Sequence, residues 1–300
     1  MKTFDIAYLL YKPEELFFKS VDRILRQNSL PERIWLLLTK DEKWNSNSLL
    51  DELKLRSISL DRIRILEIEK DDFGHGKTRN TAAELSDSDY LILMTQDAVP
   101  ADKKLCGELV NALSTASDKG TVAVAYGRQL ARDNADITEK FSRSYNYPPE
   151  SECRDIYDLE RKGIKAIFCS DACAIYNLEI FRALNGFEDD VDFNEDELYA
   201  YKALKNHYAV RYCAEARVFH SHNLSLKEQF RRSCEIAESQ KEHPEVFAEL
   251  ATEKEGVRFF KKGLAYIAKR GSLKDCIYFV IYCGIRYLGY KMPAIKKILK

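Results

Sequence analysis

An acid follows an apolar run in the segment Leu93–Pro100, where Asp97 comes two residues after Thr95. If the run Tyr90–Thr95 is a strand, Asp97 lies at the rim of the sheet, where ligands bind in doubly wound folds. One carboxylate there can hold Mg²⁺ or Mn²⁺ together with substrate phosphates and waters. A turn or helix cap is the commoner use of such an acid, so both interpretations stay open.

Two imidazoles, His220 and His222, occur at alternate positions after the apolar pair Val218-Phe219. Side chains at alternate positions of an extended chain point to the same side. Neutral imidazole is a common ligand of transition metals, so the two histidines are candidate metal ligands. Two exposed histidines without any metal would be equally ordinary.

Two further segments open helices with charged residues. In Phe73–Asn80, two glycines permit close approach of the backbone, and Lys77 and Arg79 at a helix start suit a phosphate. The plain alternative is a glycine turn before a surface helix. In Val191–Leu198, four acids fall within six positions. They suit the helix macrodipole, and one of them could instead point into a cleft as a general base.

The elements that must position these residues alternate along the first hundred residues. Short apolar runs predict strands and amphipathic runs predict helices. The strands are expected at Phe4–Leu10, Ile34–Thr39, Ile63–Ile68 and Tyr90–Thr95, and the helices at Glu14–Gln27, Ser48–Ser57 and Thr78–Leu85. This order predicts an α/β domain with a mostly parallel sheet flanked by helices.

The pattern loosens after Pro100. Strands are expected at Val122–Ala125, Ala166–Cys169, Val210–Cys213 and Arg217–Phe219, helices at Glu195–Asn206 and Ser225–Glu242, and a long loop over the site at Arg132–Glu160. We therefore predict one domain over 1–242, with a nucleotide-binding half (1–100) and an acceptor-binding half (101–242). Residues 243–300 are expected to form a C-terminal helical extension.

Charge is divided unevenly along the chain. From Val257 to Lys300, eleven Lys or Arg residues face the single acid Asp275, so this tail carries about +10 and the rest about −11. Apolar residues are interleaved with these cations, among them Phe259, Phe260, Leu264, Tyr266, Ile267, Ile277, Tyr278, Phe279, Ile281 and Tyr282. They suit either packing on the main domain or contact with an anionic membrane surface.

Other features of the sequence exclude several classes of protein. The eight cysteines include no CxxC pair and no zinc-finger spacing, and no nucleic-acid-binding motif is present. The apolar stretch Cys276–Ile285 is too short for a transmembrane helix. Because the first residues lack a signal-peptide pattern, we expect a cytoplasmic protein, with the tail as the one candidate for peripheral membrane contact.

The order of the charged segments resembles family 2 glycosyltransferases, which have the Rossmann-like GT-A fold, and within them bacterial rhamnosyltransferases. The glycine-to-ARN segment of that family matches Gly76–Asn80, its DXD matches Thr95-Gln96-Asp97, its ED base motif matches Glu195-Asp196, and its later strand-end histidine matches His220. The likeness to rhamnosyltransferases comes from Phe73–Asn80, Thr95–Pro100, His220–Asn223 and Leu226–Arg232.

The resemblance implies an inverting, metal-dependent transfer of a sugar, with dTDP-L-rhamnose as donor and a cell-surface or lipid-linked glycan as acceptor. It implies Asp196 as general base beside Glu195, and Mg²⁺ or Mn²⁺ held by Asp97, His220 and His222. Residues implied in nucleotide-sugar binding are Leu10, Tyr11, Thr39, Asp41, His75, Gly76, Arg79, Gln96, Asp97 and Arg232. Ser170, Asp171 and Gly186 are implied on the acceptor side, Gly186 leaving room for a sugar.

Two departures from the family pattern weaken particular assignments. The second strand ends in Thr39 where the family has a base-reading Asp, and Asp41 comes two residues later. The DXD has Thr95 in place of its first acid, so Asp97 is its sole acidic ligand. Alternatives are the same fold with a UDP-sugar donor, or a non-catalytic GT-A-like subunit. A nucleotidyltransferase is disfavoured because Tyr11–Glu14 lacks a glycine-rich, basic loop.

Overall fold

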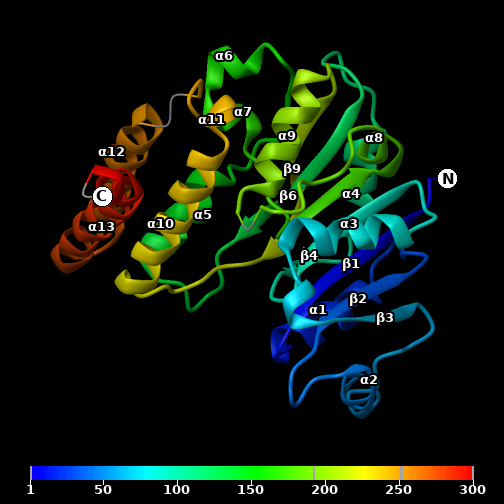
Figure 1. The fold of residues 1–300 in the computed structure, drawn as a ribbon. Helices are drawn as coiled ribbons and strands as arrows, with labels where there is room; N and C mark the ends of the chain where they lie inside the picture. The colour runs from blue at the N-terminus through cyan, green and yellow to red at the C-terminus, as the bar shows by residue number, and fades with distance from the viewer. Residues whose placement is uncertain (1, 192, 251–252, 299–300) are drawn as a thin grey trace.

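The structure, a computed structural model, describes residues 2–191, 193–250 and 253–298. Nine strands form one sheet in the order β3-β2-β1-β4-β8-β6-β9-β5, with β7 paired to β9 (Figure 1). The strands are β1 (Phe4–Tyr11), β2 (Ile34–Thr39), β3 (Ile63–Ile68), β4 (Tyr90–Thr95), β5 (Val99–Pro100), β6 (Val122–Leu130), β7 (Glu152–Arg154), β8 (Cys173–Asn177) and β9 (Ala209–Phe219).

Strands β1 to β4 pair in parallel, as the sequence predicted, and β6 pairs in parallel with β9. Strand β8 runs antiparallel to both β4 and β6 and so joins the two parallel groups. The α/β class and the GT-A architecture expected from the sequence are confirmed.

Helices cover both faces of the sheet because successive side chains of a strand point to opposite faces. In β1, Tyr8 belongs to the core beneath α1 and α4, whereas Ala7 belongs to the core beneath α3 and α9. The helices of the main domain are α1 (Glu15–Ile24), α2 (Ser46–Leu55), α3 (His75–Leu85), α4 (Leu105–Ser114), α5 (Ile137–Asn146), α6 (Asp158–Lys162), α7 (Ile164–Ile167), α8 (Leu178–Ala183), α9 (Glu195–Lys205), α10 (Leu226–Glu242) and α11 (Pro244–Phe247), with a single 3₁₀ turn at Lys70–Asp72 in the part of the chain that is described.

Two sequence-based assignments in the second half are wrong. Ala166–Cys169, predicted as a strand, begins inside the short helix α7, and the strand of this region is β8. A short apolar run cannot be distinguished from a buried helix segment by its periodicity, and Ala166 and Ile167 are both fully buried.

The predicted long loop Arg132–Glu160 contains α5, β7 and the start of α6. Helix α5 begins after Asp136, whose carboxylate accepts the backbone N–H of Glu139 at 2.8 Å. An Asp at this position is a common N-cap, and the sequence analysis did not use it because the whole stretch was interpreted as a polar loop. The two strands expected at Val210–Cys213 and Arg217–Phe219 are one strand, β9, with a register shift opposite Gly127 and Arg128.

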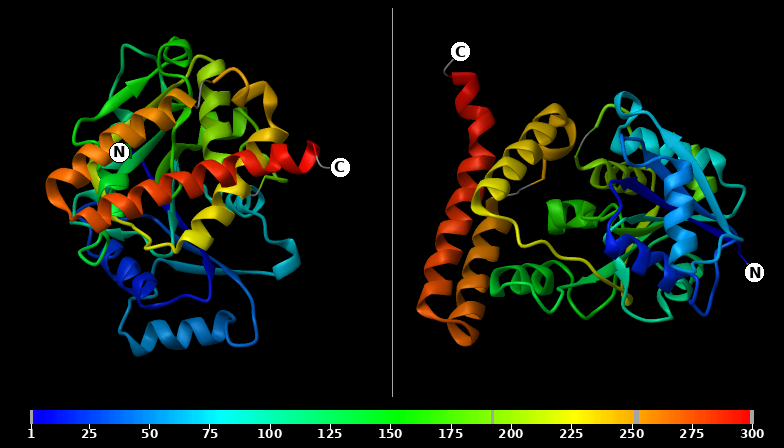
Figure 2. Two further views of the ribbon diagram at one scale, coloured as in Figure 1. Left: turned by 90° about the vertical axis from the view of Figure 1, so that its left-hand side faces the viewer. Right: turned by 90° about the horizontal axis from the view of Figure 1, so that it is seen from below.

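The C-terminal extension is a hairpin of two long helices, α12 (Glu253–Arg270) and α13 (Leu273–Ile298), packed beside α10 and α5 (Figure 2). Phe259, Ile267, Phe279 and Tyr282 form a small core with Phe141 of α5. Eight of the ten apolar residues named in the tail belong to this core, four of them buried and four partly buried, whereas Ile277 and Ile281 are exposed. No helix within the described ranges is long and apolar enough to cross a membrane.

Candidate active site

Strand pairing brings Asp97 to the two histidines. Strand β5 follows Asp97 almost immediately and pairs antiparallel with the end of β9, with Val99 opposite Phe219. The chain leaves β9 directly into His220, so Asp97 and His220 meet at the same edge of the sheet. The pairing of residues about 120 positions apart in sequence thus assembles the cluster.

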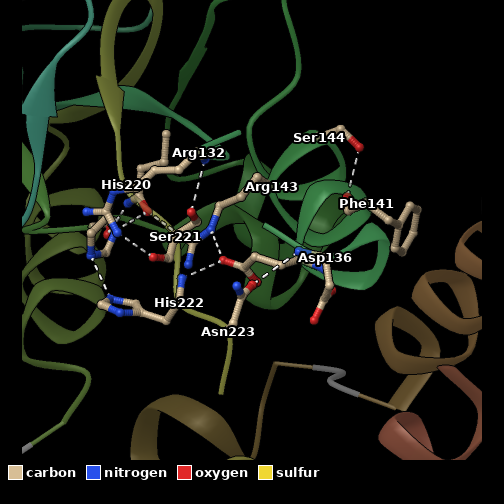
Figure 3. Close-up of polar contacts among 12 residues, drawn as sticks. Arg132, Asp136, Phe141, Arg143, Ser144, His220, Ser221, His222 and Asn223 are labelled. Atoms are coloured by element: carbon tan, nitrogen blue, oxygen red, sulfur yellow. Dashed lines mark hydrogen bonds and ion pairs between the residues drawn. The ribbon is translucent and has the colours of Figure 1, made fainter. Parts of the chain in front are cut away.

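The three side chains form a compact set of metal-ligating atoms, all within 4.8 Å of one another. His220 Nε2 lies 3.4 Å from Asp97 Oδ1, and His222 Nε2 lies 3.4 Å from Asp97 Oδ2. The two Nε2 atoms are 3.0 Å apart, so both imidazoles aim at one point, as alternate positions predict (Figure 3). This donor set fits a divalent cation.

Gln129 of β6 fixes which nitrogen of His220 carries the proton. Its side-chain oxygen accepts from Arg143 and lies 2.7 Å from His220 Nδ1, so Nδ1 must donate to it. The lone pair of His220 is then on Nε2, which faces Asp97. Such a hydrogen bond from the far ring nitrogen is typical of metal-binding histidines.

The electrostatics of the cluster favour neutral histidines and an ionised acid. Burial lowers the pKa of His220 more than Asp97 raises it. Burial, with His220 beside it, lowers the pKa of His222 to about 4. Burial alone would raise the pKa of Asp97, but the imidazoles of His220 and His222 and the Arg132 guanidinium beside it hold that pKa well below its usual range. At neutral pH all three groups are in the protonation state that binds a metal.

Arg132, which the sequence analysis did not single out, holds the two halves of this cluster together. Its guanidinium donates to the backbone oxygen of Asp97 and, at 2.7 Å, to that of Ser221, and it lies 3.4 Å from Asp97 Oδ2 (Figure 3). The predicted strand ended at Ala125, whereas β6 continues to Leu130. Arg132 therefore follows the end of β6 by two residues, at the same edge of the sheet as His220, and a correct end for β6 is the signal that would have identified it.

The proposed base, Asp196, lies at the start of α9 in a group of acids. Its Oδ2 accepts the backbone N–H of Asp171 at 3.1 Å. Burial raises the pKa of Asp196 well above its ordinary value, and the neighbouring carboxylates of Glu195, Asp171 and Glu197 raise it further. A raised pKa is what a carboxylate needs to accept a proton near neutral pH. Asp192, the remaining acid of this segment, lies outside the described residues.

A chain of hydrogen bonds connects the metal-ligand cluster to this acid. Gln129, which accepts from His220, also donates through Nε2 to Ser170 Oγ at 2.8 Å. The next residue, Asp171, donates its backbone N–H to Asp196. The predicted base Asp196, two of the predicted acceptor-side residues, Ser170 and Asp171, and the predicted metal ligand His220 are therefore parts of one connected network.

Arg79 has a different environment from the one predicted for it. Its guanidinium is 5% exposed, with Nε 3.0 Å from Asp171 Oδ2 and Nη1 2.5 Å from Glu195 Oε1. Both of these carboxylates are buried. Arg79 therefore forms ion pairs with both Asp171 and Glu195, and this network orients the acids around Asp196.

Gly76 and Gly186, which the sequence analysis assigned to ligand binding, are instead in close contact with other parts of the protein. A Cβ on Gly76 would lie 2.2 Å from the backbone oxygen of Glu188, so this glycine lets α3 pack against that loop. Gly186 has φ +58° and faces Asn80 and Phe181, with a Cβ–Oδ1 distance of 2.5 Å to Asn80. The idea that Gly186 leaves room for a sugar is wrong: its left-handed backbone ends α8.

At the end of β1, the side chain of Gln96 pairs with both backbone groups of Tyr11 at 3.0 Å. Tyr11 is 43% exposed there, whereas Leu10 is buried in the core. The Asp41 carboxylate accepts the backbone N–H groups of Lys43 and Trp44, so it caps a turn. These contacts place Gln96 and Tyr11 side by side at the carboxyl edge of the sheet.

Three residues predicted to bind the nucleotide sugar lie around this edge. Thr39 ends β2 next to Tyr11, and its buried hydroxyl has no hydrogen-bond partner among the described residues. His75 begins α3 with its ring 5.1 Å from that of Phe73. Arg232 is exposed on α10, close enough to His222 to lower its pKa. Their contacts with a ligand remain predictions.

Comparison with known proteins shows which proteins this chain is similar to. The model of the family described as "Glycosyl transferase family 2" matches residues 11–184. The chain is 31% identical over 288 residues to the O-antigen chain rhamnosyltransferase RfbN of Salmonella typhimurium, covering 94% of this chain and 86% of that protein. It is 32% identical over 234 residues to the O-antigen chain rhamnosyltransferase WbaN of Salmonella anatum, covering 76% and 71%.

Solved structures with the same fold come from more distant proteins. The mannosyltransferase PcManGT from Pyrobaculum calidifontis, in complex with GDP-Man and Mn²⁺, matches with a TM-score of 0.62 at 11% identity, over 96% of this chain and 87% of that chain. S. aureus TarS 1–349 in complex with UDP-GlcNAc matches with a TM-score of 0.54 at 11% identity, over 96% and 89%. At this identity the likeness speaks for the fold alone.

Proposed function

Because the chain belongs to glycosyl transferase family 2, we propose that it moves L-rhamnose from dTDP-L-rhamnose onto a hydroxyl of a cell-surface polysaccharide or lipid-linked glycan. The observation that carries this proposal is the 31% identity to an O-antigen chain rhamnosyltransferase over 94% of the chain. The base and metal-ligand positions retained in the sequence argue against a non-catalytic subunit.

The cofactor we propose is Mn²⁺ in preference to Mg²⁺, held by Asp97, His220 and His222. Mg²⁺ strongly prefers oxygen ligands, and two of the three ligand atoms here are imidazole nitrogens. Structural neighbours in complex with Mn²⁺ support the choice. A bound ion would neutralise the negative charge that gathers on the departing nucleoside diphosphate.

Asp196 acts as the general base in this proposal. The acceptor oxygen bonds to the anomeric carbon from one face while the bond from that carbon to the diphosphate oxygen breaks on the other, which inverts the configuration. The proton of the acceptor hydroxyl passes to the Asp196 carboxylate. Arg79 does not touch the substrates in this mechanism; it orients Glu195 and Asp171, and Asp171 in turn holds Asp196 through its backbone N–H.

The extension gives the enzyme a surface suited to an anionic membrane. Along the outer side of α13 an apolar stripe is exposed, formed by Leu273, Ile277, Val280, Ile281, Tyr287 and Leu288. Lys274 and Lys291 stand near its two ends, with Lys291 Nζ 5.6 Å above the ring of Tyr287. Aromatic and aliphatic groups beside cations are typical of helices that lie at a membrane interface.

A panel of nucleotide sugars tests the donor assignment. The purified protein is incubated with Mn²⁺ and each candidate donor. It is expected to hydrolyse dTDP-L-rhamnose faster than GDP-mannose, UDP-glucose, UDP-galactose or UDP-N-acetylglucosamine, and dTDP-L-rhamnose is expected to raise its Tm the most. A preference for one of the UDP-sugars would replace the donor while keeping the enzyme class.

A further inference from the structure

The extension and the main domain enclose a groove, outside the metal-ligand cluster, whose lining is unusual for a protein surface. It has a volume of about 600 Å³ and lies between α5, α7 and α12. Its charged lining residues are five cations and one carboxylate, namely Lys165, Arg258, Lys262, Lys269, Arg270 and Glu255. The groove therefore carries an excess of four positive charges.

The spacing of residues on two helices builds this lining. On α12, Arg258, Lys262, Ala265, Tyr266 and Lys269 recur at intervals of three and four and so share one face of the helix. On α5, Phe141, Ser144 and Tyr145 do the same, and Figure 3 shows Phe141 and Ser144 on this helix. The result is an aromatic floor beneath a row of cations.

Three of the five groove cations lie over aromatic rings, and three, Lys262, Lys269 and Arg270, have no acidic partner among the residues that the structure describes. The ammonium groups of Lys165 and Lys262 lie 5.0 and 5.6 Å from the ring centre of Tyr145, and the Arg270 guanidinium lies 4.3 Å from that of Tyr266. Glu255 takes up only part of this charge, at 3.4 Å from Lys165 and 3.7 Å from Arg258.

The groove adjoins a second cavity of about 680 Å³. The two share Tyr145, Pro148, Lys165, Glu255 and Arg258, and the second cavity is also lined by Arg154 and Phe168. Arg154 is 1% exposed, and its nearest carboxylate, on Glu152, is 3.9 Å away. Phe168 stands two residues before Ser170, which belongs to the hydrogen-bond network of the base.

We propose that this groove binds the phosphate or diphosphate group of a lipid, with the cations of α12 on the phosphate oxygens and the aromatic floor beneath the apolar chain. An acyclic apolar chain leaving the groove past Arg270 meets Leu273 and Ile277, where the exposed stripe of α13 begins. That the lipid is the carrier of the sugar acceptor rests on the proposed function, whereas the binding site itself does not.

Farnesyl diphosphate, a short soluble lipid diphosphate, is the probe for this site. Its affinity is measured by calorimetry on the full chain, with dTDP and Mn²⁺ present in excess to occupy the nucleotide site. The test variant reverses two exposed cations of the groove, Lys262→Glu with Lys269→Glu. The matched control reverses two exposed lysines that do not line it, Lys261→Glu with Lys241→Glu.

We expect saturable binding that weakens at least about tenfold in the groove variant, as for loss of one or more charge-assisted hydrogen bonds, and changes little in the control. Inorganic pyrophosphate is expected to bind more weakly than farnesyl diphosphate. The site assignment is overturned if farnesyl diphosphate does not bind, if the control loses as much affinity, or if pyrophosphate binds equally well. Donor hydrolysis measured on the same proteins reports separately on the proposed function.

Discussion

Replacing Arg79 by methionine would leave two buried carboxylates, Asp171 and Glu195, without their counter-charge. These three side chains are 5%, 3% and 7% exposed, respectively. Removing one partner of such a buried network costs about 3–5 kcal/mol in the free energy of unfolding. In a chain of this size about 2 °C is lost per kcal/mol, so Tm is expected to fall by roughly 6–10 °C.

Thermal unfolding followed by circular dichroism measures this change. The matched control is Arg26→Met, which breaks an exposed ion pair with Asp22 and should shift Tm by about 1 °C or less. Neutralising both acids in the Arg79→Met background, with Asp171→Asn and Glu195→Gln, should recover part of the loss because no charge is then left buried and unpaired.

The competing idea, that Arg79 binds a donor phosphate, predicts a different pattern. It requires the KM for the sugar nucleotide to rise while Tm stays unchanged. If Arg79→Met gives that pattern, the structural role argued for Arg79 is refuted.

Three other predictions concern the metal, the base and the membrane. Asp97→Asn should lower the activity by roughly 100-fold or more and abolish the dependence of the activity on added Mn²⁺, since Asp97 is the only carboxylate of the cluster. Asp196→Asn should abolish transfer, while the affinity for dTDP measured by calorimetry should be nearly unchanged. In the wild-type protein, the rate of transfer should fall as pH drops through the raised pKa of Asp196, because the base works only when deprotonated. Ile277→Glu with Ile281→Glu should abolish sedimentation with anionic liposomes while donor hydrolysis persists.

Each of these has a result that would contradict it. Undiminished activity in excess EDTA would exclude the metal. Near-normal transfer by Asp196→Asn, with loss in Glu197→Gln, would move the base by one residue. If the wild-type chain ignores anionic liposomes at low salt, or binds them regardless of salt, the stripe on α13 has another use.

The parallel strands of the first half could be predicted because each is a short apolar run between polar residues. β2, β3 and β4 begin and end at the predicted residues. The nearness of the three candidate metal ligands was partly predictable, because His220 and His222 alternate in sequence and Asp97 follows the end of β4 by two residues. What brings Asp97 to them, the two-residue strand β5, is too short to leave any pattern in the sequence.

The environment of Arg79 could not be predicted from local sequence. An arginine near a helix start suits a phosphate, but its partners Asp171 and Glu195 come from segments about 90 and 115 residues later in the chain. Gly186 was misinterpreted for the same reason, since Asn80 and Phe181 fill the space beside it only in the folded chain. Arg132 was overlooked because β6 extends five residues beyond its apolar segment, into a mixed stretch with glycine, arginine and glutamine that carries no clear strand pattern.

In the tail, periodicity did not separate the residues that pack from those that stay exposed. Phe279 is fully buried against Phe141, while Ile281, two positions on, is 47% exposed. Both belong to one apolar run in the sequence. Only the position of α5 and α12 determines which side of α13 is covered.

We propose that this chain transfers rhamnose with inversion, using the Asp97–His220–His222 cluster for the metal and Asp196 as the base. The most direct test incubates the protein with dTDP-L-rhamnose, Mn²⁺ and candidate lipid-linked acceptors, and identifies the product by mass spectrometry and the anomeric linkage by NMR. We predict one added deoxyhexose, an inverted anomeric configuration, and no product with EDTA or with Asp196→Asn. A product of retained configuration, or transfer of a different sugar in preference to rhamnose, would contradict the account.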